Sequence, residues 1–161
     1  MDAETAAALR QLLATRPVGA LATLHRGEPA VSMVPFALPA GTTQLLIHVS
    51  ALATHTRDMQ EHPRVALLVM AEPGSGVAPQ VVSQALPRVS LQAEARTLAR
   101  ESTAHAAARA AYIERFPEAA HIFELGDFSL VALQPLSARL VAGFGRAHSL
   151  VGGALEDWLR G

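Results

Sequence analysis

The chain has 161 residues, a formal net charge of −1 and no cysteine. This length predicts a single domain, residues 1–161, with a substantial core. The balanced charge and the lack of a run of basic residues argue against a nucleic-acid partner. The missing cysteines exclude disulfides, thiolate metal sites and thiol nucleophiles.

Two further properties of the sequence narrow its chemistry and location. All 13 basic residues are arginine, so no lysine is available to form a Schiff base. No apolar run approaches the roughly 20 residues that span a bilayer, so we expect no membrane partner. The N-terminus is acidic at Asp2 and Glu4, where a signal peptide would be basic. A cytoplasmic protein is therefore expected.

The first quarter of the sequence predicts a helix followed by a hairpin. Residues 2–15 are rich in Ala and Leu, begin at a good N-cap and are closed by a proline, which predicts a helix. A strand is expected over 18–25, a turn at 26–29 and a returning strand over 30–38.

The middle of the sequence predicts strands with one short helix between them. A strand is expected over 45–49, a helix over 52–61 and a buried strand over 65–70. Residues 72–87 are rich in Pro, Gly and Ser and predict a long loop. The clearest strand is 88–98, because its apolar and polar residues alternate almost completely.

The C-terminal part predicts more helix and two more strands. We expect helices over 102–116 and 118–124, strands over 128–133 and 139–144 separated by Gln-Pro, and a last helix over 150–161. The order of elements is not a regular βαβ repeat. Consecutive short strands indicate a mainly β protein of the α+β kind, with an antiparallel sheet closed into a barrel and helices outside it.

Three hydroxyls and an arginine gather where a strand ends and a helix begins, at Ser50, Thr54, Thr56 and Arg57. Free backbone N–H groups and the helix dipole favour an anion at such a corner, and guanidinium and hydroxyl groups suit phosphate. The alternative is that the hydroxyls only cap the helix while Arg57 lies in solvent. This segment alone leaves both open.

Arg88 is the candidate for a second phosphate contact. It opens the strand 88–98, on the face that also carries Ser90 and Gln92. An arginine on a strand presents its guanidinium in a defined direction, which favours a binding role. An exposed charge on a solvated face is the alternative.

Two other segments are candidates for contact with a flat ligand. Pro35 interrupts the apolar strand 31–36, and because it has no N–H it indicates an edge, a bulge or the end of pairing. Phe144 lies between two glycines and is followed by Arg146, so it can pack against a ring system. The alternatives are an edge strand without a ligand and a bend eased by glycine.

The histidines give no sign of a metal site. The seven of them show no spacing such as HExxH, and no GxSxG elbow supports a catalytic triad. We therefore expect no metal site, and the sequence assigns no catalytic residue.

Taken in order, these segments resemble the flavin-binding split-barrel superfamily of pyridoxamine 5′-phosphate oxidase, and within it the branch of bacterial heme-utilisation proteins. The matching stretches cover nearly the whole chain: GALAT at 19–23, SMVPF at 32–36, SALATHTR at 50–57, PRV at 87–89, GDF at 126–128 and GFGRA at 143–147.

The resemblance implies a homodimer of six-stranded antiparallel split barrels that binds FMN between its subunits and acts as an oxidoreductase on an unknown small molecule. It implies that the flavin ring lies along Ser32, Met33, Val34 and Pro35. It implies that the phosphate is held by Ser50, His55, Thr56, Arg57 and Arg88, and that Phe144 and Arg146 approach the cofactor.

The sequence also departs from the family pattern. Asp58 replaces the asparagine typical of the family, and its carboxylate weakens phosphate binding unless it points away or pairs with Arg57. Two alternatives to the FMN oxidoreductase follow. One is a heme-handling module that uses the same dimer groove, with His121 or His148 as candidate iron ligand. The other is a barrel that has lost its cofactor, for which Asp58 is the hint.

Overall fold

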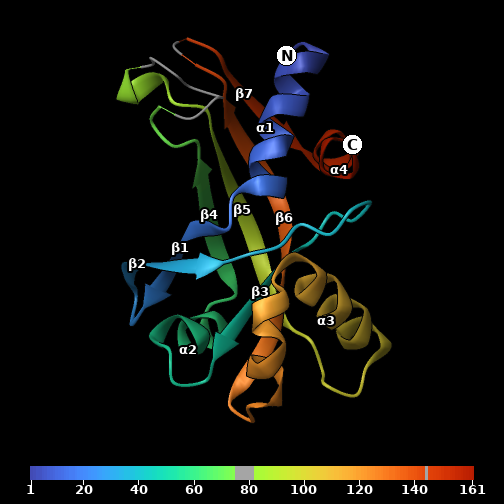
Figure 1. The fold of residues 1–161 in the computed structure, drawn as a ribbon. Helices are drawn as coiled ribbons and strands as arrows, with labels where there is room; N and C mark the ends of the chain where they lie inside the picture. The colour runs from blue at the N-terminus through green and yellow to red at the C-terminus, as the bar shows by residue number, and fades with distance from the viewer. Residues whose placement is uncertain (75–81, 144) are drawn as a thin grey trace.

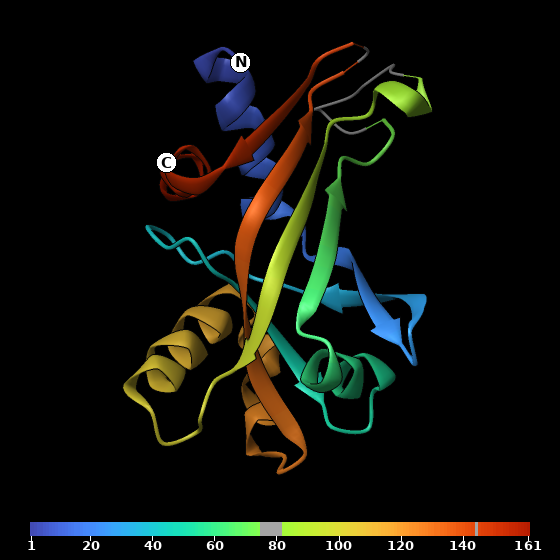
Figure 2. The ribbon, with the colours of Figure 1, turned by 180° about the vertical axis from the view of Figure 1, so that it is seen from behind.

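A computed structural model describes residues 1–74, 82–143 and 145–161 of the chain, and shows a twisted antiparallel sheet with helices around it (Figures 1 and 2). The helices are α1 (Ala3–Thr15), α2 (Thr54–Glu61), α3 (Thr103–Arg115) and α4 (Gly152–Arg160), with 3-10 turns η1 (Ser83–Ala85) and η2 (Pro117–Glu124). The strands are β1 (Val18–His25), β2 (Glu28–Pro35), β3 (Leu45–Ser50), β4 (Arg64–Met70), β5 (Arg88–Thr97), β6 (Phe128–Val141) and β7 (Ala147–Val151).

The strands form one sheet in the order β2-β1-β4-β5-β6-β3, with β7 also paired to β6. All of the pairings are antiparallel, which confirms the predicted mainly β architecture with peripheral helices. Beside the two end strands, an isolated bridge pairs Ala37, just after β2, with Leu46 of β3. The sheet is therefore curled but not closed, as in a split barrel, and among the described residues it has seven strands where six were expected.

The break that we predicted at Gln134–Pro135 is wrong, because β6 runs through it as one strand. The pairing of β5 with β6 shifts at this point, from Gln92 opposite Ser137 to Ala93 opposite Pro135. A bulge of this kind leaves one residue unpaired, so the strand can contain a proline, which has no N–H to donate. The first half of β6 pairs with β3 and the second half with β7, so the sheet divides along this strand.

The N-terminal helix and hairpin form as their sequence predicts. The carboxylate of Asp2 accepts a hydrogen bond from the Thr5 amide at 2.8 Å and so caps α1. Arg26 and Gly27 have φ of 53° and 84°, the left-handed conformation that a tight two-residue hairpin needs. The returning strand β2 leaves the sheet at Pro35, as predicted for a proline at the end of pairing.

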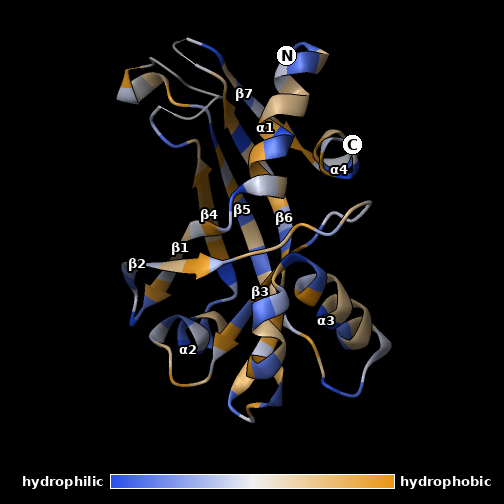
Figure 3. Cartoon of the chain, in the orientation of Figure 1, coloured by the Kyte–Doolittle hydropathy of each residue, from blue (hydrophilic) through white to orange (hydrophobic). Residues whose placement is uncertain are grey.

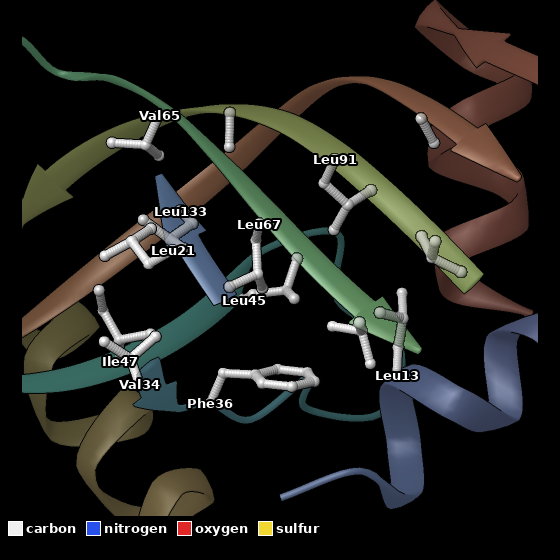
Figure 4. Close-up of a cluster of buried hydrophobic side chains, with 14 of the residues drawn as sticks. Leu13, Leu21, Val34, Phe36, Leu45, Ile47, Val65, Leu67, Leu91 and Leu133 are labelled. Carbon is white, nitrogen blue, oxygen red and sulfur yellow. The ribbon is translucent and has the colours of Figure 1, made fainter. Parts of the chain in front are cut away.

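Two apolar clusters hold the sheet and helices together. The larger one fills the barrel and includes Phe36, Leu45 and Leu67, which are almost completely buried (Figure 4). The smaller one packs α3 and η2 against the start of β6, around Tyr112 and Phe116. One face of β5 is buried and the other exposed, which confirms the alternation predicted for this strand.

The two ends of the chain lie side by side (Figures 1 and 2). α4 begins at Gly152, and the residues before it form β7 rather than the helix predicted from residue 150. The Trp158 indole donates a hydrogen bond to the Ala6 carbonyl at 3.0 Å and so links α4 to α1.

Candidate functional site

Two of the three hydroxyls at the corner between β3 and α2, those of Ser50 and Thr56, form hydrogen bonds within the chain. Ser50 Oγ donates to Asp127 Oδ2 at 2.8 Å and accepts from the Leu52 amide at 3.1 Å. The buried Thr56 hydroxyl donates to the Ser50 carbonyl at 2.7 Å. These contacts support the alternative that the hydroxyls shape the turn, and the carboxylate of Asp127 makes the corner less suitable for an anion. Arg57 is exposed next to it.

Ser32 and His55, which were both predicted to contact the cofactor, lie next to each other. Ser32 on β2 and His55 on α2 lie with Oγ and Nδ1 3.1 Å apart. Burial lowers the pKa of His55, although the nearby Asp58 carboxylate opposes this shift. His55 is therefore a neutral, half-buried imidazole at the border between α2 and the edge strand β2.

Asp58 is directed at β1 and not at Arg57. It is 3% exposed, and it accepts hydrogen bonds from Thr23 Oγ1 and from His25 Nδ1, each at 2.8 Å. The hydrogen bond from His25 is the main reason why the pKa of Asp58 is lowered. Asp58 thus fastens α2 to β1, and it gives no support to the idea of a barrel that has lost its ligand.

Arg57 and Arg88 do not converge within one chain. Arg57 lies on α2, which leads into the start of β4, whereas Arg88 pairs with Met70 at the other end of β4. Figure 2 shows α2 at the foot of the sheet and the start of β5 at the opposite end. A single phosphate held by both guanidinium groups of one chain, as the sequence suggested, is therefore not what this fold provides.

Arg88 instead lies among other arginines. It lines an open pocket of about 400 Å³, called here the arginine pocket. The lining residues are Arg88, Ser90, Arg139, Val141, Gly143, Gly145, Arg146 and Ala147. Arg139 donates to Ser149 Oγ at 3.0 Å, and Arg146 donates to Asp2 Oδ2 at 3.2 Å and to Thr5 Oγ1 at 2.8 Å. Phe144, predicted to contact the cofactor, lies outside the described residues.

An apolar groove of about 360 Å³ lies on the same face of the sheet. Its lining residues are Arg16, Val18, Gly19, Ala20, Val31, Ser32, Met33, Leu68 and Met70. Val31 and Met33 are 73% and 65% exposed, although they belong to a strand. Figure 3 colours part of this strand, β2, as hydrophobic. Alternation along β2 turns the Val34 side chain into the core, where it is 2% exposed, so Val34 would meet a ligand in the groove through its backbone.

The pairing of β4 with β5 joins the groove to the arginine pocket. Met70 and Leu68 of the groove are directly opposite Arg88 and Ser90 of the pocket. Directly paired residues of antiparallel strands point to the same face, so the two sites form one surface, apolar at one side and cationic at the other. Sequence reasoning missed Met70 and Arg139, because only the strand register places them beside Arg88. It also missed Arg16, which the end of α1 places at the groove.

The two histidines proposed as iron ligands do not lie on this surface. His121 is exposed on η2, and His148 is paired with Leu140, whose side chain points into the core. His48 is half-buried and stacks on Phe123 with ring centroids 3.9 Å apart. Within the described ranges, no three His, Asp or Glu residues are placed to hold a metal ion. No helix in those ranges is long and apolar enough to cross a membrane.

Comparisons with known proteins give three relatives whose names refer to heme. Non-canonical heme oxygenase HOZ of Arabidopsis thaliana is 32% identical over 76% of this chain, and the match covers 35% of that protein. Heme oxygenase HutZ of Vibrio cholerae is 30% identical over 86% of this chain and 77% of its own length. The structure of a heme binding protein from Mycobacterium smegmatis matches with a TM-score of 0.81 and 31% identity, over 96% of this chain and 61% of that one.

These relatives correct the expected cofactor. FMN was implied by resemblance alone, whereas the similar proteins are named for heme. Within one chain, the separation of Arg57 from Arg88 also leaves no phosphate site that the two guanidinium groups share. This chain spans only about a third of the plant protein and about three fifths of the mycobacterial one.

The family described as Pyridoxamine 5′-phosphate oxidase matches residues 5–142, which is most of the chain. The sheet, the helices and the order of the matching segments agree with that assignment. The chain therefore belongs to the pyridoxamine 5′-phosphate oxidase family of split barrels, and heme oxygenase HutZ is one of its relatives there.

Proposed function

We propose that this protein binds heme and takes part in heme utilisation, with heme as its cargo or substrate. The observation that carries the proposal is the single surface on which the apolar groove adjoins the arginine pocket. The heme-related names of its relatives support the same ligand.

The chemistry of this surface fits heme. Heme is a flat, largely apolar ring that carries two carboxylates along one edge. Met33 and Met70 offer flexible, polarizable side chains that adapt to the face of a ring. Arg88 and Arg139 offer planar guanidinium groups that bind carboxylates in bidentate fashion. The groove and the pocket, about 360 and 400 Å³, each lie in the size range of small-molecule sites.

We also propose that a second copy of the chain completes the site. β2 is an end strand of the sheet, and it exposes Val31 and Met33 next to the groove. Apolar residues on an exposed edge strand are usually covered by a partner. A homodimer through this edge would enclose heme between the copies, with Ser32 and His55 at the border of the interface.

Heme oxygenase activity is the more specific form of this proposal. It is favoured by two relatives that are named heme oxygenases. The chain would bind and orient heme, while oxygen and electrons come from outside it. Loss of the heme absorption band under air with ascorbate, at a rate above that of free heme, would support this activity, and an unchanged band would limit the protein to binding.

An absorption titration with heme tests the proposal. We expect a saturable shift of the Soret band for the wild type. In Arg88→Gln with Arg139→Gln, the heme dissociation constant should rise about tenfold to hundredfold, since a hydrogen bond to a charged group contributes about 1.5–3 kcal/mol. A wild-type titration that shows only non-saturable partition would refute heme binding. Size-exclusion chromatography of the same samples tests the dimer.

A further inference from the structure

Arg16 lies at the end of the apolar groove with an incomplete set of hydrogen bonds. Its Nη2 donates to Glu72 Oε1 at 2.6 Å, and its side chain is 23% exposed. Its Nε is buried and has no hydrogen-bond partner among the described residues. A guanidinium normally binds a carboxylate through two parallel N–H groups, such as Nε and Nη2 together. Glu72 uses only one of them, so the Arg16 donor edge is only half occupied.

The fold holds Arg16 at this place. Arg16 is the C-cap of α1, where its amide donates to the Leu12 carbonyl at 2.9 Å, and Pro17 directly follows it. Its side chain lines the apolar groove together with Met70. Met70 in turn pairs with Arg88 of the arginine pocket. Arg16 and Arg88 thus both neighbour Met70, one through the groove and one through the pairing of β4 with β5.

We infer that Arg16 binds one carboxylate of the heme that occupies the apolar groove, and that Glu72 fills this position only while heme is absent. This inference rests on the proposed function and adds a residue and a competitor to it. The heme carboxylate would take both Nε and Nη2 of Arg16 and displace the Glu72 carboxylate. Arg16 and Arg88 would then hold the two carboxylates of one ring edge.

The state of Glu72 supports its role as a competitor. Its side chain is 65% exposed, so it can swing into solvent without loss of packing. The hydrogen bond from Arg16 is the main cause of the lowered pKa of Glu72, so the competing group is a carboxylate at neutral pH. The ion pair is open to solvent on the Glu72 side, and such a pair contributes little to folding, which makes its exchange for a ligand carboxylate easy.

Heme titrations of four variants test this inference. Arg16→Met should raise the heme dissociation constant about tenfold, because a charge-assisted bidentate contact is lost. Glu72→Gln should lower it about twofold to fivefold, because the competing charge is gone. The matched controls are Arg109→Met and Glu124→Gln, which remove another exposed Arg–Glu pair, with Nη2 and Oε1 3.3 Å apart, and should leave heme affinity unchanged.

Heme dimethyl ester, whose carboxylates are blocked, is the second probe. Arg16→Met should bind the ester as the wild type does, because the ester has no charge for Arg16 to hold. Saturable heme binding by the wild type with no change in Arg16→Met or Glu72→Gln would overturn the role of Arg16 and leave the proposed function intact. If the wild type itself does not bind heme saturably, the role of Arg16 and the proposed function are both refuted. If Arg16→Met does not fold, Glu72→Gln tests the inference alone: higher heme affinity supports the role of Arg16, and unchanged affinity overturns it.

Discussion

Met33 offers the sharpest separation of ligand binding from folding. Its side chain is 65% exposed in the single chain, so a polar substitution there should change the free energy of unfolding by no more than about 0.5 kcal/mol. If heme and a second copy cover it, binding removes its remaining apolar surface from water. Full burial of such a side chain contributes about 1.5–3 kcal/mol, so the part still exposed should contribute about 1–2 kcal/mol to binding.

The expected effects follow from these values. Met33→Ala should raise the heme dissociation constant about fivefold to thirtyfold. Met33→Asp should raise it more than about a hundredfold, because an unpaired carboxylate would be buried against the apolar ring of heme. Soret titration gives the affinity, and thermal unfolding of the chain without heme gives the stability.

Leu125→Asp is the control for Met33→Asp. Leu125 is also exposed, at 46%, but it lies in the turn after η2 and not in the groove. This variant should bind heme like the wild type. Equal heme affinity in Met33→Asp and Leu125→Asp would show that the groove is not the binding surface, and the reasoning above would be refuted.

Three further predictions concern the elements that support the site. Burial lowers the pKa of His48 from 6.5 to about 4. As the pH falls from 7 to 5, His48 therefore becomes protonated in the unfolded chain and stays neutral in the folded chain. The free energy of unfolding should therefore drop by about 1–2 kcal/mol between pH 7 and pH 5 in urea titrations, and His48→Phe should remove this drop; an equal drop in the variant would disprove the assignment. The hydrogen bond from His25 lowers the pKa of Asp58 in the folded chain. The ionised Asp58 therefore stabilises the fold at pH values above the ordinary carboxyl pKa, and this stabilisation is lost as the pH falls through the lowered pKa of the folded state. Asp58→Asn should show less acid-dependent loss of ellipticity, and an unchanged acid profile would count against this pair. In Gly19→Ala the new Cβ would lie 2.9 Å from Leu67 Cδ1 and 3.2 Å from the Leu68 carbonyl oxygen. This crowding should lower the free energy of unfolding by about 1–3 kcal/mol, measured by thermal unfolding. A variant as stable as the wild type would mean that β1 and β4 can move apart to accommodate the methyl group.

Local patterns in the sequence predicted most of the fold. The range 18–25 was correct for β1, because apolar alternation and flanking turn residues act over a few positions. The break at Pro135 was wrong, because only the partner strand shows that a bulge accommodates the proline. β7 was missed for a similar reason, since its pairing with the end of β6 is a tertiary contact.

The candidate site was predicted less well, because its residues meet through pairing and not through sequence proximity. Ser50 and Thr56 carry groups that suit phosphate and helix capping equally, and the structure uses them for the turn. Arg88 was identified from its position on a strand, yet its neighbours Met70 and Arg139 depend on the register of β4, β5 and β6. The resemblance gave the family correctly; the relatives contradict its main ligand, FMN, and favour its alternative, heme.

The most direct test of the account is a heme titration of the purified protein beside the double variant Met33→Asp with Arg88→Gln, followed by absorption. The account predicts one saturable Soret transition in the wild type and none in a variant that is folded by circular dichroism. The same titration curve for both proteins, saturable or not, would contradict the claim that this surface binds heme.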